Sequence, residues 1–292
     1  MKILVTSDLH YNIKRSVKPT YDVVKKIIDQ QGDVLVLLGD NAGANLADHD
    51  ACFALFKNFA GKKFFVPGNH CLWCQPGQLA LDRYENLLPE IADKHGFITL
   101  DHNPTIIDGI AFAGSIGWYD YSLHDERLAI PREFYENKIS PGAANYYQEF
   151  NFLVEKYRED LNDRHFDIGA RWLDRWRMNW DFSDLEFLNI LLEKLNGQLI
   201  DLSSKCQQII TFVHHLPFAE LLPDQEIPDK FKFAKAFLGS KKIGELLLKF
   251  DKVSHTFCGH SHWPISTKVG HITAVNNGST YIEKQLSVLE LH

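Results

Sequence analysis

Five short apolar segments, each followed by a side chain of a metal-binding type, constrain this chain more than any other feature. The segments KILVTS, DVLVLLG, KFFVPG, QIITFV and HTFCG are rich in Val, Ile, Leu and Phe, which is typical of strands buried on both faces. The polar residues that follow them, in the same order, are Asp8, Asp40, Asn69, His214 and His260. Helical patterns lie between the segments, so the alternation predicts a layered α/β fold.

The helical patterns have recognisable ends. Three of them are each followed by a glycine that is expected to end the helix, and they cover residues 20–31, 47–60 and 78–95. Ser183 and Glu186 form a capping box that predicts a further helix, which we expect to stop at Gly197. Residues 271–292 contain two more strand patterns separated by turn residues.

Residues 119–182 differ from the rest, because they are rich in Tyr, Trp, Arg, Asp and Glu and have only short apolar runs. We expect one domain over residues 1–292 with a helical, aromatic-rich insert at about 119–182. Within the insert, Trp172, Trp176 and Trp180 are spaced to share one face of a helix. This face either docks on the core or helps to shape a substrate cleft.

The polar residues at the predicted strand ends are suited to one metal site. Ligands of open α/β sheets bind beyond the carboxyl ends of the strands. Asp8 and His10 are two residues apart, as are His260 and His262, so each pair can point to one side of an extended segment. Imidazole and carboxylate ligands suit Mn, Fe, Zn or Co, and two ions about 3.5–4 Å apart can share one carboxylate and activate a bridging water. Asp40, alone at its strand end, is the natural bridge.

Each motif taken singly is weak, since an Asp-x-His pair is usually a solvated turn and a His–His pair usually reflects packing. Five such motifs in order, each at a predicted strand end, favour a site. Glycines precede three of these ends, at Gly39, Gly68 and Gly259. We expect them to let the backbone pass close to the ions.

The motifs DLH, GDN, GNH, VHHLP and GHSH resemble the five signature blocks of the calcineurin-like metallophosphoesterases, and they span residues 8–262. The resemblance implies a four-layer αββα sandwich of two mixed sheets flanked by helices, with a two-metal site at the strand ends. The ligands that it implies are Asp8, His10 and His262 for one ion and Asn69, His214 and His260 for the other, with Asp40 bridging. It also implies that His70 contacts the phosphate and stabilises the transition state or protonates the leaving group.

The sequence departs from the family pattern in two places. Many members have an acidic residue after the GNH histidine, where this chain has Cys71, so carboxylate support for His70 is in doubt. The second block reads GDNAGAN and lacks the Asp–Arg pair of the protein phosphatases, which disfavours that activity. The metal ligand in the fourth block is either His214 or His215, and the family pattern favours His214.

We therefore expect a dinuclear phosphoesterase that cleaves a phosphodiester or phosphomonoester by attack of a metal-bridging hydroxide. The expected cofactors are two transition-metal ions, chosen from Mn²⁺, Fe²⁺ or Fe³⁺ and Zn²⁺, and the expected substrate is a small phosphate ester. The alternatives are a non-catalytic metal-binding scaffold and a nuclease. A net charge of −7 and the lack of a basic run argue against nucleic acid. No membrane segment or signal peptide is apparent, so we expect a cytoplasmic protein; the oligomeric state stays open.

Overall fold

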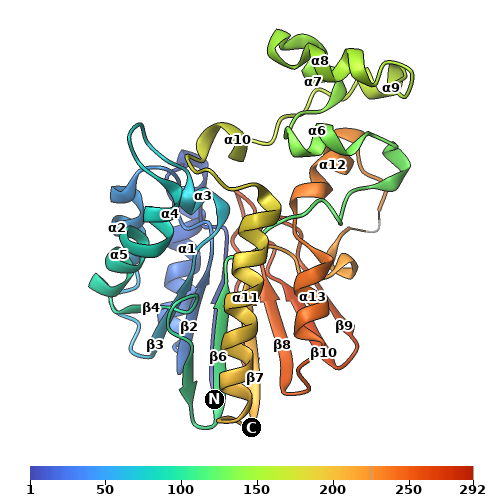
Figure 1. The fold of residues 1–292 in the computed structure, drawn as a ribbon. Coiled ribbons are helices and arrows are strands. Elements are labelled where there is room, and N and C mark those ends of the chain that lie inside the picture. Colours follow the sequence, from blue (N-terminus) through green and yellow to red (C-terminus); the bar gives the residue numbers. More distant parts are fainter. Residues whose placement is uncertain (224, 292) are drawn as a thin grey trace.

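Two β-sheets face each other in the computed structural model, which describes residues 1–223 and 225–291 (Figure 1). The first sheet has the strand order β11–β1–β2–β3–β4, and the second has the order β5–β6–β7–β8–β10–β9. Both sheets are mixed, because β11, β5 and β9 pair antiparallel with otherwise parallel neighbours. The strands of the first sheet are β1 (Lys2–Thr6), β2 (Val34–Leu38), β3 (Lys62–Val66), β4 (Phe97–Thr99) and β11 (Ser287–Glu290). Those of the second are β5 (Thr105–Ile107), β6 (Ile110–Ser115), β7 (Gln208–Val213), β8 (Val253–Cys258), β9 (Ile265–Val269) and β10 (Ile272–Asn276).

The space between the sheets is filled by every second residue of the strands. Val34, Val36 and Leu38 of β2 are all buried there, and Phe212 of β7 belongs to the same apolar cluster. The intervening residues, such as Leu35 of β2, belong to a second cluster that packs against the helices. Both faces of the central strands are therefore buried, which explains their continuous apolar runs.

Helices cover the outer face of each sheet, so the αββα sandwich implied by the sequence is confirmed. In Figure 1 the helices α1, α2 and α5 lie beside the first sheet, and α11 and α13 lie against the second. Their bounds are α1 (Lys14–Gln30), α2 (Leu46–Ala54), α5 (Leu88–Lys94), α11 (Asp184–Ser203) and α13 (Lys241–Leu247). Shorter elements are α3 (Asn69–Leu72), α4 (Ala80–Asp82), a π-helical turn (Arg83–Leu87), α12 (Asp229–Ala234) and 3₁₀ turns at Ala219–Leu221 and Lys235–Phe237. No helix within 1–223 and 225–291 is long and apolar enough to cross a membrane.

The helix that begins at the capping box is longer than the sequence suggested. Ser183 and Glu186 form the box as expected, but the predicted stop at Gly197 is wrong, because α11 continues to Ser203. Leu199 and Leu202 extend the buried face of the helix beyond the glycine. Their burial outweighs the low helix propensity of one exposed glycine.

Residues 119–182 form a series of short helices rather than one long one. These are α6 (Arg132–Glu136), α7 (Pro141–Tyr146), α8 (Asn151–Lys156), α9 (Asp163–Phe166) and α10 (Asp174–Arg177), with 3₁₀ turns at Glu126–Leu128 and Gln148–Phe150. In Figure 1, α6 to α9 project above the upper end of the second sheet, and α10 lies over the top of the sandwich. The segment thus extends over the edge where the parallel strands end.

The expected helical stripe of three tryptophans is wrong. Helix α10 has a single turn and ends at Arg177, because the backbone of the next residue, Met178, is extended. The three indoles consequently have different neighbours: Trp172 stacks on Phe237, Trp176 meets the edge of Phe150, and Trp180 packs on Phe187. Separate tertiary contacts for each indole replace the shared face that the spacing predicted.

Gly197→Ala should raise the free energy of unfolding by about 0.5–1 kcal/mol, because alanine restricts the unfolded chain and favours a helix interior. A Cβ atom at Gly197 would meet no heavy atom within 4 Å. Urea denaturation measures the change. Gly169→Ala is the matched control, since its Cβ also meets open space but it lies outside a helix. Its free energy of unfolding should therefore rise less. A destabilised Gly197→Ala variant would contradict the continuous helix.

Candidate metal centre

The seven predicted ligands lie together at the carboxyl ends of the parallel strands, the ends that face the top of the sandwich in Figure 1. Those from the first sheet follow β1, β2 and β3, and are Asp8, His10, Asp40 and Asn69. Those from the second sheet follow β7 and β8, and are His214, His260 and His262. The two facing sheets therefore both contribute to the centre.

Five of the seven predicted ligands have a left-handed backbone conformation. Their φ angles are 53° at Asp8, 43° at His10, 53° at Asp40, 67° at His260 and 58° at His262. Positive φ is uncommon outside glycine, although Asp, Asn and His tolerate it better than most residues. Such conformations concentrate at functional sites, where the surrounding structure maintains them.

Three glycines allow the ligand-bearing loops to pack closely against the predicted ligands. A Cβ atom on Gly39 would lie 2.0 Å from Nδ1 of His214, and one on Gly68 would lie 2.2 Å from Oδ1 of Asp40. At Gly259 the added atom would lie 2.6 Å from Oδ2 of Asp8. Any side chain at these positions would displace a predicted ligand.

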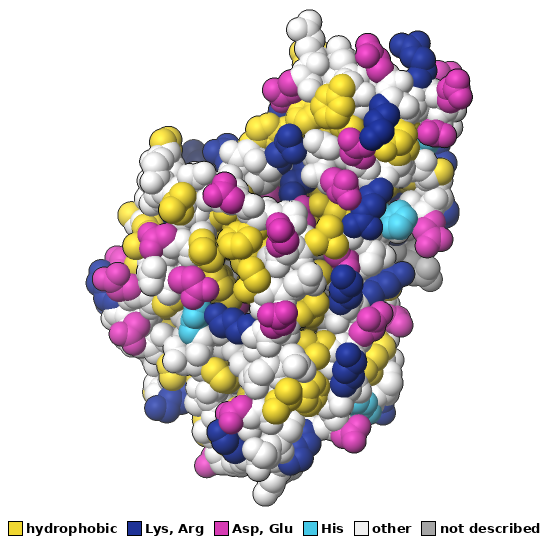
Figure 2. Space-filling model, in the orientation of Figure 1, with side chains coloured by type: hydrophobic (Ala, Val, Ile, Leu, Met, Phe, Trp, Pro, Cys, Tyr) yellow, Lys and Arg dark blue, Asp and Glu magenta, His cyan; other side chains and the backbone are white. Residues whose placement is uncertain are grey.

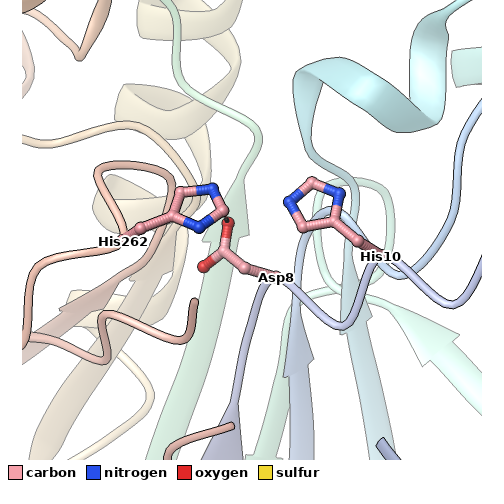
Figure 3. A group of neighbouring side chains, drawn as sticks. All are labelled: Asp8, His10 and His262. Atoms are coloured by element: carbon pink, nitrogen blue, oxygen red, sulfur yellow. Dashed lines mark ion pairs between the residues drawn. The ribbon is translucent and has the colours of Figure 1, made fainter. Parts of the chain in front are cut away.

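The first group of donors is formed by Asp8, His10 and His262, drawn in Figure 3. The Asp8 carboxylate lies between the two imidazoles, with Oδ1 3.9 Å from Nε2 of His262. The two rings are parallel, with centroids 5.2 Å apart. Ser7 donates its hydroxyl to Oδ2 of Asp8 at 2.5 Å, and the backbone N–H of His260 donates to both oxygens at 3.1 Å. The carboxylate is thus fixed before any ion binds.

Asp40 occupies the middle of the centre. Its Oδ1 accepts the backbone N–H of His70 at 2.9 Å, which orients the other oxygen. Oδ2 lies 3.5 Å from Nε2 of His214 and 3.9 Å from Nε2 of both His10 and His70. A single carboxylate oxygen therefore faces imidazoles from both sheets, as a bridging ligand requires.

The second group of donors is Asp40, His214 and His260. Nδ1 of His214 contacts the carbonyl oxygen of Leu38 at 3.1 Å, and Nε2 of His260 contacts that of Phe237 at 3.2 Å. These contacts fix the rings and leave Nε2 of His214 and Nδ1 of His260 to bind an ion. His215 has no place in these donor groups, and its Nδ1 contacts the carbonyl oxygen of Ile116 at 3.0 Å. The geometry favours His214 over His215 as the ligand.

The donor set fits transition-metal ions. Several buried ligand atoms have no hydrogen-bond partner among the described residues: both ring nitrogens of His10, Nε2 of His214 and Oδ1 of Asn69. Leaving buried polar atoms unpaired is costly, and an ion coordinated by them would remove that cost. Mixed imidazole, carboxylate and amide donors suit Mn, Fe or Zn.

The charges within the centre are set by burial and by the central carboxylate. Burial, with neighbouring imidazoles, lowers the pKa of His10 and His260 well below the usual value. Burial opposes the charge of Asp40, but the imidazoles of His214 and His70 hold the pKa of that carboxyl well below its usual range. Burial would likewise lower the pKa of His214, but Asp40 raises it to about 9. The metal-free centre thus contains a buried imidazolium–carboxylate pair.

His70 is partly exposed, at 19%, as is His262, at 24%. His70 also forms a third group of possible metal donors with His10 and Asp40. Its ring stacks on Trp73, with centroids 3.7 Å apart and planes at 24°. Cys71, which follows it, is fully buried, and burial raises the pKa of its thiol to about 12. The neutral thiol gives His70 no charged support, so Trp73 and Asp40 are the groups that hold it.

A buried carboxylate from the insert holds the predicted amide ligand. Oδ1 of Asp174 accepts Nδ2 of Asn69 at 2.9 Å and the indole N–H of Trp73 at 2.7 Å. Its Oδ2 accepts the indole N–H of Trp172 at 2.7 Å and the hydroxyl of Tyr119 at 3.0 Å. Because Nδ2 of Asn69 is engaged, its Oδ1 is the atom directed at the centre. Outer partners of this kind orient metal ligands.

The family follows from a comparison with protein-family models. Residues 1–264 match the model of the calcineurin-like phosphoesterases. The chain belongs to this family. Membership places it among the metal-dependent phosphoester hydrolases, in agreement with the five motifs and with the donor groups at the strand ends.

Solved structures share the calcineurin-like fold at low sequence identity. A phosphopantetheinyl hydrolase from Mycobacterium tuberculosis is 16% identical, with a TM-score of 0.64 over 94% of this chain and 88% of that one. A protein from Thermus thermophilus is 14% identical, with a TM-score of 0.54 over 98% and 97% of the two chains. A dimetal phosphatase from Danio rerio is 14% identical, with a TM-score of 0.51 over 94% and 86%. No curated protein sequence matches the chain.

Sequence reasoning located the motif residues but missed the groups that position them. Asp174 was passed over within a segment noted for its tryptophans, although an acidic residue two positions from Trp172 is a natural acceptor for the indole N–H. Lys284 was also missed, and its buried ammonium donates to the carbonyl oxygen of Asp8 at 2.6 Å. No local pattern marks Lys284, because 276 residues separate the two partners.

Asp174→Asn should weaken Mn²⁺ binding by about 10–100-fold, the usual effect of losing a partner that orients a ligand. An amide cannot accept all four hydrogen bonds, so the Asn69 side chain loses its fixed orientation. Isothermal titration calorimetry on the metal-free protein measures the affinity. Asp184→Asn is the matched control, because this buried carboxylate also accepts an indole N–H, from Trp118 at 2.8 Å, but contacts no predicted ligand. Equal affinities for both variants would remove Asp174 from the centre.

Metal affinity should rise with pH up to about 9 and then level off. The raised pKa means that His214 keeps its proton below about pH 9 in the metal-free protein, and an ion must displace that proton to bind. Each unit of pH below 9 should then cost about tenfold in affinity. Calorimetry at pH 7 in buffers of different ionisation enthalpy should detect about one released proton. Binding without proton release would contradict the buried ion pair.

Proposed function

We propose that the protein is a dinuclear metal-dependent phosphohydrolase that cleaves a phosphodiester or phosphomonoester of a small molecule. The observation that carries the proposal is the convergence of donor side chains from both sheets on Oδ2 of Asp40. The proposed ligands are Asp8, His10 and His262 for one ion and Asn69, His214 and His260 for the other, with Asp40 shared. When bound, the ions supply Lewis-acid stabilisation at phosphorus and lower the pKa of a water nucleophile.

In this proposal His70 is the protein group that contacts the substrate. Its backbone is held by Asp40, its ring plane is held by Trp73, and its side chain borders the cleft above the centre. From this position it donates a hydrogen bond to a phosphoryl oxygen or a proton to the leaving group. The fixed ring lowers the cost of reorganisation during the reaction.

The two alternative functions account less well for these observations. A non-catalytic scaffold would not need His70, a histidine at the cleft that neither proposed ligand set uses. A nuclease needs a basic surface along the nucleic-acid backbone, whereas Figure 2 shows acidic and basic side chains interspersed on the face that it displays. The net charge of −7 points the same way.

The deciding experiment is hydrolysis of bis-p-nitrophenyl phosphate and p-nitrophenyl phosphate by protein stripped with a chelator and reloaded with Mn²⁺, Fe²⁺ or Zn²⁺. We expect about two ions per chain by elemental analysis, and turnover of at least one ester that chelation abolishes. Asp40→Asn should lose both metal and activity. Protein that binds two ions and hydrolyses neither ester would support the scaffold alternative.

His70→Ala should keep its metal content but lower turnover by about 10²–10⁴-fold, the usual contribution of a positioned acid–base group. The loss should be smaller for p-nitrophenyl esters than for esters of alcohols, because p-nitrophenolate leaves without protonation. Elemental analysis and steady-state kinetics measure both effects.

His95→Ala is the matched control for this variant. His95 is similarly exposed, at 16%, but pairs with Asp50 away from the centre, so turnover should not change. Loss of metal from His70→Ala would recast this residue as a ligand, and full activity on alcohol esters would remove it from the mechanism.

A further inference from the structure

The cleft above the metal-binding side chains is larger than a phosphate group requires. Its volume is about 680 Å³, and its floor includes Asp40, Asn69, His70, His260 and His262. Pockets for organic ligands of drug size measure about 300–1,000 Å³. The cleft can therefore hold a large organic group attached to the phosphorus.

The walls of the cleft are mainly apolar, and large apolar side chains are exposed in it. Leu173, directly before α10, is 42% exposed, Phe231 of α12 is 53% exposed, and Trp263, directly after His262, is 38% exposed. They come from three separate segments that all line this cleft. Exposed apolar side chains gathered at one place mark a binding surface.

Several polar side chains that line the cleft already have partners in the protein. Asp174 accepts four hydrogen bonds, as described above. The ammonium of Lys235 lies 3.3 Å from Oδ2 of Asp125, and the hydroxyl of Ser261 accepts Nδ2 of Asn276 at 2.5 Å. A polar group of a ligand would lose its hydrogen bonds to water in the cleft, and these side chains could replace only some of them.

Two more polar side chains lie at the border: Thr280 has a hydrogen-bond partner, whereas the exposed Arg171 stacks on aromatic rings, a contact that uses none of its N–H donors. The guanidinium of Arg171 lies over the rings of Tyr147 and Trp176, 4.5 Å and 5.3 Å from their centroids. The hydroxyl of Thr280 accepts the backbone N–H of Glu283 at 3.0 Å. Apart from Arg171 at the border, the lining is thus better suited to hydrocarbon than to a sugar or a peptide.

We propose that the substrate is a phosphoester that carries a large, uncharged apolar group, alkyl or aryl. This inference rests on the proposed phosphoesterase function. The phosphoryl group lies over Asp40 and His70, and the apolar group extends between Leu173, Phe231 and Trp263. Burial of the hydrocarbon supplies binding energy that the phosphate alone does not provide.

The test measures binding separately from turnover. The affinities of ethylphosphonate and hexylphosphonate for Mn²⁺-loaded protein are compared by calorimetry, together with a phosphonate of hexyl length whose chain contains ether and hydroxyl oxygens. Hexylphosphonate should bind about 10–200-fold more tightly than ethylphosphonate, because each fully buried methylene contributes about fourfold. The phosphonate with the polar chain should bind less than threefold more tightly than ethylphosphonate. Equal affinities, or an equal gain for the polar chain, would overturn the proposal.

Variants locate the apolar site. Phe231→Ala and Trp263→Ala should each reduce the hexyl-to-ethyl affinity ratio at least threefold. Phe152→Ala is the matched control, because Phe152 is also about half exposed, at 51%, but lies on α8 and does not line the cleft, so the ratio should not change. An unchanged ratio in both cleft variants would overturn the proposal.

Hydrolysis of n-alkyl p-nitrophenyl phosphates and n-alkyl phosphates by the same metal-loaded protein separates the two proposals. Turnover with no dependence of affinity on chain length would refute the apolar substrate and retain the phosphoesterase. Binding that tightens with chain length, without hydrolysis of any ester, would refute the phosphoesterase and retain an apolar phosphorus-containing ligand.

Discussion

The charge of the Asp40 carboxylate is the interaction on which the rest of the centre depends. Asp40 is almost fully buried, and burial alone would favour its neutral form. The surrounding imidazoles reverse that preference, and one of them, His214, becomes cationic as a result. The glycines that precede the motifs allow this approach, because a side chain at Gly39 or Gly68 would enter the space of the pair. The close backbone approach and the charge states of the centre thus both depend on the Asp40 carboxylate.

The insert contributes both to the centre and to the cleft above it. Asp174 orients Asn69 and also fixes the indoles of Trp73 and Trp172, which form part of the cleft wall. A change that moves α10 would therefore alter the proposed ligand Asn69 and the wall together. This coupling links the wall of the proposed substrate cleft to the proposed metal ligands.

The sequence predicted the centre better than its surroundings, for a physical reason. Parallel strands end at one edge of a sheet, so Asp8 and Asp40 could be brought together from local patterns alone. The contact between Asn69 and Asp174 spans 105 residues and follows from no periodicity. Short strands such as β4 and β9 also escaped notice, as did the extension of α11 past Gly197, because tertiary packing determines them. The fold class could be predicted from the sequence, whereas the arrangement of the insert could not.

The ligands come from both sheets, and this has a mechanical consequence. The sheets are held together by an apolar layer, whose dispersion contacts have no preferred direction. Ions bound between Asp40 of the first sheet and His214 of the second would add a directional cross-link at one end of the sandwich. The loaded protein would then open from its far end, where the chain termini lie in Figure 1. Metal loading would in this way set the direction of unfolding as well as the chemistry.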